Sequence, residues 1–445
     1  MIPNRGPAVL GVTGATDLPA AADVVVIGGG VIGVTTALEL ARAGHDVCLL
    51  EKGVIAGEQS SRNWGWVRQA GRDLRELPLS KVARSRWQAL AEEIGPELGY
   101  VECGIAYVAR SPEQADRHRR WVAEATRLGI RAEIADVKTL APGLNADYAT
   151  ALYLPGDGRA EPQVAAPLFA RLAIAAGATV LQGCAAYEIE RDAKGISGVR
   201  TERGRIATKR VVLAGGIWTS ALLHRLGISL PQLKVLSSVC RTEPLSPEQR
   251  RAFSSCLSLG DLALRHRADG GLVAANSDTM VAEIVPDSLR YLRAFLPGLR
   301  STFRGMKLRI GRGTLRELGW LASAGALERS LTRHRILDPT PDATALARVK
   351  DRLADRFPAL AGLQREQAWG GMIDVTPDAI PVISEVPALP GLIIGTGFSG
   401  HGFGIGPGAG VALAALATGA ESEVDLADFR FSRFKDGRLQ LQSWL

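Results

Sequence analysis

The chain has 445 residues, of which 46% are hydrophobic and 5% aromatic, and its 53 Lys and Arg against 46 Asp and Glu give a net charge of +7. This length exceeds one hydrophobic core, so two domains are expected, and the composition excludes a disordered or fibrous protein. The five cysteines are dispersed without a CxxC pair, which argues against a disulfide framework or a metal site and is typical of a reducing cytoplasm. The first 22 residues hold one arginine and no compact apolar run, unlike a signal peptide.

The first strong motif spans residues 24–51. A buried strand, 24–27, runs into Gly28-Gly29-Gly30-Val31-Ile32-Gly33, then helical periodicity continues to about residue 43 and a second apolar strand ends in Glu51. A GxGxxG run after a strand, opening a helix and followed by an acid, is typical of a βαβ dinucleotide site. Gly28 would permit the tight turn, Gly30 would admit the pyrophosphate to the helix N-terminus, and Gly33 would let helix and strand pack closely. Glu51 would hold the ribose hydroxyls.

Two later glycine turns indicate that the ligand is extended. Residues 177–220 read as strands crossing a hairpin, and they end in a buried strand that runs into Gly215 and Gly216. A third turn lies in residues 395–410, after the apolar strand 392–394. A nicotinamide enzyme would normally continue through one doubly wound domain of about 150 residues. Three distant segments that meet at one ligand are typical of FAD rather than NAD.

The third turn contains SGHGFGIGPGAG, residues 399–410, with glycine at every even position and one histidine, His401. A flexible linker is not expected, because the stretch lies between a buried strand and the helical run GVALAALATG. A membrane helix is excluded, because the glycines and Pro407 limit the helix-forming run to about a dozen residues. The pattern predicts a glycine turn that brings backbone close to a ligand.

The net charge is concentrated in one segment. Residues 300–335 contain nine Lys or Arg and only two acids, Glu317 and Glu328, so the remainder of the chain is close to neutral. Apolar residues at helical spacing predict a basic helical insertion near 300–336, which either packs in solvent or against a subunit, or contacts an anionic membrane surface. Nucleic acid is not an expected partner, because no binding motif accompanies the charge.

The sequence resembles the D-amino-acid oxidase and sarcosine oxidase superfamily of FAD-dependent amine oxidoreductases, and in particular its D-amino acid dehydrogenase-like members. Five stretches in the expected order carry the resemblance, and they are VIGGGVIG with LLEKG, GEQSSRNWGWVRQ, VVLAGGIWTS, WGGMIDVTPDAIPVI and GFSGHGFGIGPG. The implied fold is α/β, with a Rossmann-like FAD-binding domain built from residues 22–86, 150–230 and 366–445. The implied α+β substrate domain comprises residues 87–149 and 231–365, a mixed sheet that includes the basic insertion.

The resemblance also implies which residues hold the cofactor. The ADP half would contact Gly28, Gly30, Gly33, Glu51, Lys52 and Ala186. The pyrophosphate and flavin edge would contact Ser60, Ser61, Arg62, Asn63, Gly215, Gly216 and Trp218. The isoalloxazine would be surrounded by Gly371, Met372, Gly400, His401 and Gly402, with glycine backbone from 397 to 408 lying against the flat ring.

Three departures from the superfamily limit what the resemblance implies. Gly371 stands where sarcosine-oxidase-like members attach FAD through a cysteine, so the FAD would be non-covalent. Gly404 replaces a lysine that helps to hold the substrate carboxylate, and Met372 replaces an arginine of D-amino-acid-oxidase-like members. Arg68 matches the carboxylate-binding arginine of sarcosine-oxidase-like members, and its alternative role is a structural salt bridge.

Other side chains are candidates for the same pocket. His401 is expected either at the flavin edge, as a catalytic residue beside Arg68, or simply packed. Arg265 and Arg267 on a strand of the second domain are reserves for the carboxylate. The aromatic candidates for the pocket wall are Trp64, Trp66, Trp369 and Phe398.

The implied reaction is oxidation of the CH–NH bond of a primary or secondary α-amino acid to an imine, by hydride transfer to flavin N5 followed by hydrolysis. D-amino acids, proline-like imino acids and N-alkyl glycines are the leading substrates. The alternatives are an FAD-dependent 2-hydroxy-acid dehydrogenase and a flavin subunit of a heteromeric dehydrogenase. The electron acceptor is oxygen or a quinone, and a dehydrogenase is favoured because none of the nine lysines matches one placed near the flavin. A cytoplasmic protein is expected, with peripheral contact to the inner membrane face through 300–336 as one option.

Overall fold

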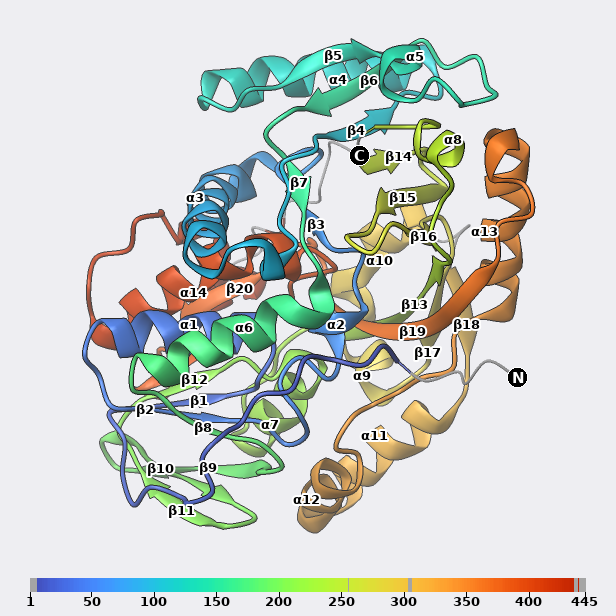
Figure 1. The fold of residues 1–445 in the computed structure, drawn as a ribbon. Helices are drawn as coiled ribbons and strands as arrows, with labels where there is room; N and C mark the ends of the chain where they lie inside the picture. Colours follow the sequence, from blue (N-terminus) through green and yellow to red (C-terminus); the bar gives the residue numbers. More distant parts are fainter. Residues whose placement is uncertain (1–5, 255, 303–305, 436–438, 440–445) are drawn as a thin grey trace.

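The glycine motif lies at the centre of a six-stranded sheet (Figure 1). The structure is a computed structural model, which describes residues 6–254, 256–302, 306–435 and 439. β1 pairs in parallel with β12 and β2, β8 and β21 extend the sheet in parallel, and β20 runs antiparallel to β21. In sheet order the strands are β20 (Val382–Glu385), β21 (Leu392–Thr396), β12 (Val211–Leu213), β1 (Val24–Ile27), β2 (Val47–Leu50) and β8 (Thr179–Leu181). These short Val, Leu and Ile runs are typical of parallel strands that are covered on both faces.

Helices cover one face of this sheet and a second, smaller sheet lies on the other (Figure 1). The covering helices are α1 (Val31–Arg42), α3 (Leu77–Ile94), α6 (Pro162–Ala175) and α14 (Gly402–Thr418). On the opposite face lie β9 (Ala186–Asp192), β10 (Gly195–Thr201) and β11 (Gly204–Ala207), with η3 (Gly216–Trp218) and α7 (Thr219–Arg225). Each face buries its own apolar cluster, so the first glycine turn is held from both sides.

Helix α14 begins earlier than the sequence predicts. The glycine turn was expected to extend to residue 410, but the helix starts at Gly402 and includes four further glycines. A Cβ on Gly406 would lie 2.9 Å from the side chain of Val31, and one on Gly410 would lie 2.5 Å from Thr35 Oγ1. A Cβ on Gly408 would lie 2.8 Å from the carbonyl oxygen of Leu79 in α3. These glycines therefore allow close helix packing, which outweighs their low helix propensity.

The second large sheet has ten strands of mixed direction, as the sequence predicted for the substrate domain. Most neighbours are antiparallel, whereas β14 with β4 and β17 with β18 are parallel pairs. In order the strands are β18 (Met306–Arg309), β17 (Met280–Glu283), β13 (Leu233–Thr242), β16 (Leu272–Asn276), β15 (Leu262–His266), β14 (Cys256–Ser258), β4 (Ile105–Val108), β6 (Thr150–Leu154) and β5 (Glu133–Asp136), and β19 (Arg365–Val375) pairs with β13. Around it lie α4 (Pro112–Arg127), α5 (Val137–Leu140), α8 (Pro247–Arg250) and α13 (Ala343–Arg356).

Two strands join the halves of the molecule. β6 and all of β19 but its first residue lie in ranges that the sequence assigns to the FAD-binding domain, 150–230 and 366–445, yet they pair in the ten-stranded sheet. A short ribbon of β3 (Trp66–Val67) and β7 (Gly158–Arg159) also lies between the sheets. The domain limits themselves remain a prediction, and residues 436–438 and 440–445 of the last range lie outside the described residues.

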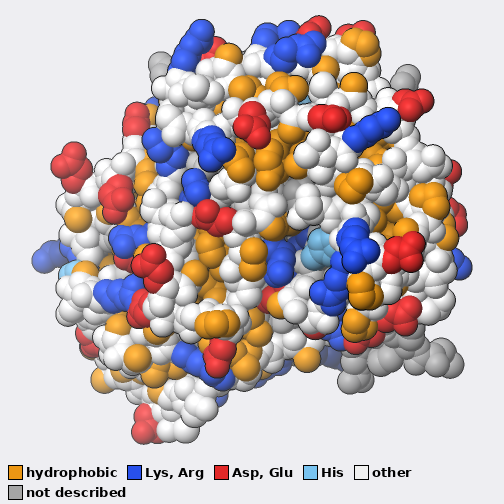
Figure 2. Space-filling view, turned by 45° about the horizontal axis from the view of Figure 1, so that its top comes forward, with side chains coloured by type: hydrophobic (Ala, Val, Ile, Leu, Met, Phe, Trp, Pro, Cys, Tyr) orange, Lys and Arg blue, Asp and Glu red, His pale blue; other side chains and the backbone are white. Residues whose placement is uncertain are grey.

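The basic segment forms a helical excursion from the ten-stranded sheet. It follows α9 (Pro286–Arg290) and includes α10 (Leu292–Thr302), β18, α11 (Arg312–Ala322) and α12 (Ala324–Arg333), with residues 303–305 outside the described part. Leu327 and Leu331 are buried in the apolar cluster beneath the six-stranded sheet, and Lys234 pairs with Glu317. Figure 2 shows Lys and Arg interspersed with Asp and Glu over one face of the molecule. No helix in the described part of the chain is long and apolar enough to span a membrane.

Candidate functional site

A cavity of about 360 Å³ lies between the two large sheets. Side chains and backbone from both halves line it, in residues 27–32, 50–72, 186, 214–222, 237–239, 276–280, 331, 371–374 and 395–404. All three glycine turns that the sequence singled out therefore meet at one elongated space. Among the sequence-predicted cofactor residues, Gly33 and Ser61 do not line it, and the others do.

The N-terminus of α1 forms one end of the cavity. Gly28 has φ +115°, and a Cβ on it would overlap the carbonyl oxygen of Ala214. Gly33 packs against the carbonyl of Gly28, as the motif requires. The N-cap, Gly30, has no side chain to bond the free N–H groups, and the Ser60 hydroxyl accepts from Val31 N–H at 2.8 Å. A helix N-terminus without acidic residues in its first turn is suited to bind a phosphate.

Glu51 follows β2 and lies beside this turn. Its carboxylate accepts the N–H groups of Gly29 at 2.8 Å and Gly53 at 2.7 Å. Burial raises the pKa of Glu51, and the neighbouring Lys52 opposes that shift. Lys52 itself donates to Glu58 at 2.6 Å and to the backbone carbonyls of residues 334 and 335, so it fastens the basic excursion to this wall. The carboxylate shapes the glycine loop and borders the space that a ribose would occupy.

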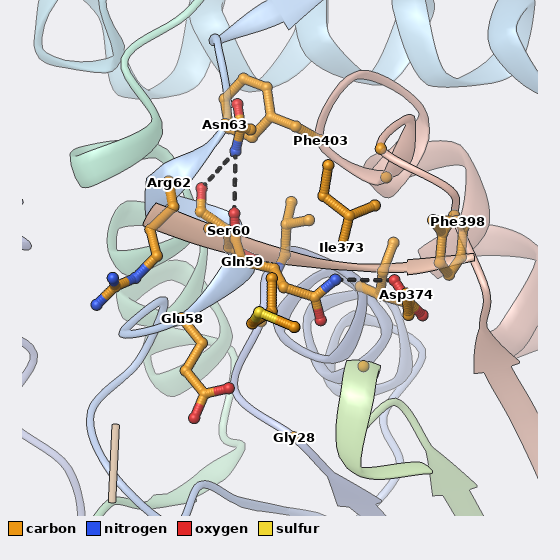
Figure 3. A pocket seen from close by; sticks show the side chains of 18 of the residues that line it. Gly28, Glu58, Gln59, Ser60, Arg62, Asn63, Ile373, Asp374, Phe398 and Phe403 are labelled. Carbon is orange, nitrogen blue, oxygen red and sulfur yellow. Dashed lines mark hydrogen bonds between the residues drawn. The ribbon is translucent and has the colours of Figure 1, made fainter. Parts of the chain in front are cut away.

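The segment that the sequence predicted near the pyrophosphate and flavin edge is only partly turned toward the cavity (Figure 3). Asn63 bonds the backbone carbonyl of Ser60 at 2.7 Å, and both lie at the cavity. Arg62 is part of the wall, but its guanidinium points away and pairs with Asp338 at 2.6 Å and with the carbonyl of residue 370. The Ser61 hydroxyl bonds the carbonyl of residue 58. The guanidinium of Arg62 therefore holds the wall in place.

Sequence reasoning missed the carboxylate that ties the turns together. Asp374, at the end of β19, accepts from Gln59 at 2.8 Å (Figure 3). The same carboxylate accepts from Gln232 at 3.0 Å. It also accepts from Thr396 Oγ1 at 3.1 Å and from the N–H of Gly397 at 2.6 Å. Asp374 lies in the motif WGGMIDVTPDAIPVI, so the sequence did contain a signal for this acid. Its two glutamine partners, however, are 315 and 142 residues away in the chain.

The other end of the cavity brings Arg68 and His401 together. His401 is the N-cap of α14, and Gly402 and Gly404 of the first turn also line the space, so the positive end of this helix faces it. His401 Nδ1 lies 3.4 Å from Glu76 Oε1. Burial lowers the pKa of His401 from 6.5 to about 4, which keeps the ring neutral at physiological pH. Gly406 and Gly408 pack against α1 and α3 and do not face the cavity. The prediction that glycine backbone from 397 to 408 lies against the flavin ring is therefore wrong from Gly406 onward.

Glu76 and Arg72, which sequence reasoning also missed, lie behind His401. Glu76 is fully buried, and although burial opposes its ionisation, His401 and Arg72 lower its pKa. Arg72 is 1% exposed and donates to the carbonyl of His401 at 3.2 Å. A cationic and an anionic side chain thus support the turn on which His401 lies.

The reserve residues have other roles. Arg265 is buried in a two-pronged pair with Glu161, and Arg267 pairs with Asp269 and Glu366, so neither lines the cavity. Trp64, Trp66 and Phe398 do line it, whereas Trp369 is buried and donates to the carbonyl of residue 62 at 3.0 Å.

The residues present fit an FAD bound without a covalent bond. The phosphate-binding helix end, the acid after the second strand and two further glycine turns surround one continuous space. Gly371 offers no sulfur for attachment, and a Cβ there would lie 3.2 Å from Arg62 Cβ. Among the described residues no group of three potential metal ligands was found.

Comparisons with known proteins agree with this geometry. The family described as DAO, FAD dependent oxidoreductase, matches residues 23–416. Glycine oxidase from Geobacillus kaustophilus is 27% identical over 426 residues, which cover 92% of this chain and 97% of that protein. The mitochondrial sarcosine dehydrogenase of Homo sapiens is 25% identical over 99% of this chain, but the chain spans only 44% of that protein.

Solved structures extend the likeness over nearly the whole fold. L-amino acid deaminase from Proteus myxofaciens, solved in complex with anthranilate, superimposes with a TM-score of 0.90 at 28% identity, covering 97% of each chain. L-proline dehydrogenase from P. horikoshii gives a TM-score of 0.78 at 25% identity, covering 95% of this chain and all of that one. Because the family match includes all three glycine turns and the cavity between them, the chain belongs to the DAO family of FAD-dependent oxidoreductases.

Proposed function

We propose that the protein oxidises the CH–NH bond of a primary or secondary α-amino acid to the imine, which water then hydrolyses. The observation that carries the proposal is a cation, Arg68, that lines the same cavity as His401. An α-carboxylate needs a charged partner in a partly dry pocket. The relatives named for glycine, sarcosine, L-proline and L-amino acids support this substrate class. The leading candidates are D-amino acids, proline-like imino acids and N-alkyl glycines, with L-amino acids now added by the structural likeness.

Each side chain at this end has a defined task in the proposal. Bound FAD would supply the hydride acceptor. Arg68 holds the carboxylate, so that the α-carbon is fixed in one orientation. His401 Nδ1 is directed toward Glu76, which leaves Nε2 as an acceptor for the substrate amine. Trp64 and Trp66 form an edge-to-face pair in the cavity wall and exclude water from it.

The first test is an anaerobic screen of the purified holoprotein. D- and L-amino acids, proline and sarcosine are the donors, and bleaching of the flavin absorbance is the readout. Bleaching by one of these supports the proposal, and retained FAD without bleaching across the set would reject the amino-acid assignment. Bleaching only by a 2-hydroxy acid would identify the alternative enzyme. Turnover that requires a second protein would favour a subunit of a heteromeric dehydrogenase.

The second test addresses Arg68. Arg68→Ala should retain FAD, because the glycine turns and Glu51 hold the cofactor elsewhere, and should lower kcat/KM by roughly 100-fold for amino acids. Arg68→Lys should restore only part of the loss, because an ammonium lacks the planar two-point geometry. An amine without the carboxylate should respond little. Equal losses for both substrates, or release of FAD, would show that Arg68 is structural.

The basic excursion is proposed as a peripheral contact to an anionic membrane. Ile310 and Leu315 are 76% and 70% exposed and lie next to Arg309, Arg312 and Arg316. Exposed apolar side chains among cations are suited to an anionic bilayer surface. Flotation of the protein with anionic but not with zwitterionic vesicles would support the contact, and Ile310→Glu should abolish it.

The electron acceptor is proposed to be a quinone rather than oxygen. Rapid peroxide production by the pure enzyme would instead identify an oxidase.

A further inference from the structure

We propose that Arg72 is a second cationic contact for the substrate carboxylate, beside Arg68. This inference rests on the proposed function, because it requires a substrate that carries a carboxylate. It assigns the carboxylate site to two guanidinium groups four residues apart, one on each side of the turn between β3 and η1 (Leu74–Glu76).

The hydrogen bonds of Arg72 leave one nitrogen free. Nε donates to the carbonyl of Arg68 at 2.9 Å, and Nη2 donates to the carbonyl of His401 at 3.2 Å. Nη1 has no hydrogen-bond partner among the described residues, although Glu76 Oε1 lies 3.5 Å away. The side chain is 1% exposed and lines the cavity. An unpaired buried N–H is costly, so a ligand oxygen at this point is favourable.

The charges around the two guanidinium groups favour an anion between them. Burial lowers the pKa of Arg72 to about 10, and the positive charge of Arg68 contributes to that shift. Glu76 and Asp157 oppose it, and burial raises the pKa of Asp157 to about 6. A substrate carboxylate would relieve the repulsion between the two cations and would satisfy Nη1 at the same time.

The first turn of α14 provides no cation of its own. Gly404 lies there, and a Cβ on it would be 2.9 Å from the carbonyl oxygen of Trp66 and 3.2 Å from the nitrogen of Arg68. A side chain at this position would displace the strand that carries Arg68. Arg72 contacts the same turn by donating to the carbonyl of His401. The second positive charge therefore comes from the β3–η1 turn.

The test compares two probes of the same shape, 2-aminobenzoate and 2-aminobenzamide. Both carry the ring and the ortho amine, but only the first has a carboxylate. Binding to the holoenzyme is measured by calorimetry and by the change in flavin absorbance, without turnover. The test variant is the double Arg72→Met, Glu76→Gln, which removes both charges and leaves no unpaired buried carboxylate. The control is Arg433→Met, Asp378→Asn, a buried ion pair that does not line the cavity.

We expect the wild type to bind the acid more tightly than the amide, and the Arg72 double variant to weaken acid binding by about 10- to 100-fold with little change for the amide. The control should keep the wild-type ratio. Arg72→Lys retains the positive charge but not the planar two-point geometry of a guanidinium, so it should give an intermediate ratio of acid to amide affinity. This variant replaces the double variant if the latter does not fold.

Two negative results are distinguishable. If the wild type prefers the acid, Arg68→Ala removes the preference and the Arg72 variants do not, the inference is overturned and the proposed function stands. If the wild type binds acid and amide equally, no carboxylate site exists here, and the inference and the amino-acid assignment both fail.

Discussion

Residues 28–33 and 397–410 are both glycine-rich and both lie between a strand of the six-stranded sheet and a helix, but their glycines have different roles. In the first, the glycines form the turn and the helix start at the cavity. In the second, Gly397 and Gly400 have positive φ and form the turn, whereas Gly406, Gly408 and Gly410 lie inside α14 and pack on α1 and α3. The first segment is therefore one turn at the cavity, whereas the second combines a turn at the cavity with a helix whose later glycines serve packing.

The largest effect should come from Gly33→Ala in the first segment. Its Cβ would overlap the carbonyl of Gly28 and force the turn away from α1, so we expect the purified protein to contain no FAD and to have no activity. Flavin absorbance per protein is the measurement. Gly11→Ala is the control, because a Cβ there meets no atom of the described residues within 4 Å. A Gly33→Ala protein that retains FAD would contradict the role assigned to this turn.

The second segment should make stability depend on pH through His401. Its pKa is lowered from 6.5 to about 4 by burial, and Arg72 and Arg68 add to the shift while Glu76 opposes it. Between these two pH values the unfolded chain binds a proton that the folded protein does not, so the free energy of unfolding should fall by about 3 kcal/mol as pH drops from 6.5 to 4.

Denaturant unfolding of wild type and His401→Gln at pH 7 and pH 4.5 isolates this contribution from the other buried groups. The variant should lose less stability on acidification than the wild type. Parallel losses in the two proteins would mean that His401 is protonated in the folded state as easily as in the unfolded chain.

Gly410→Ala should lower the free energy of unfolding by about 2 kcal/mol, because an added methyl group at 2.5 Å from Thr35 Oγ1 overpacks the contact between α14 and α1. The melting temperature and the flavin content are measured together. The folded fraction should keep its FAD, in contrast to Gly33→Ala. Loss of FAD at unchanged stability would place Gly410 at the cofactor and remove the difference between the two segments.

Gly400→Ala should have the smallest effect on the apoprotein. The residue has φ +83°, which costs about 1 kcal/mol for alanine, but the nearest atoms to an added Cβ are 3.8 Å away in Ile373. If the flavin ring lies against this backbone, the Kd for FAD should rise while the apoprotein stability changes by only that amount. An unchanged Kd would show that the ring does not approach residue 400.

Local spacing made the first half of the site predictable. The strand, glycine turn, helix and Glu51 lie within 28 consecutive residues, so the βαβ unit could be derived from their order alone. The mixed second sheet was implied by the family resemblance. The start of α14 did not, because the packing on α1 and α3 that stabilises a glycine-rich helix involves residues about 370 and 330 positions earlier.

The sequence by itself determined that three glycine turns serve one extended cofactor and that the chain resembles amine-oxidising flavoproteins, because each motif is contiguous and its spacing reflects local geometry. Only the tertiary structure decided which charged side chains face the cavity. Arg62 turns to Asp338, Arg265 turns to Glu161, and Arg72 joins Arg68. The direction of these charged side chains depends on where β3, η1 and the His401 turn meet. His401 and Glu76, which lie together there, are 325 residues apart in the chain. No local pattern encodes such a contact, because the direction of a buried charge is set by the partners that surround it.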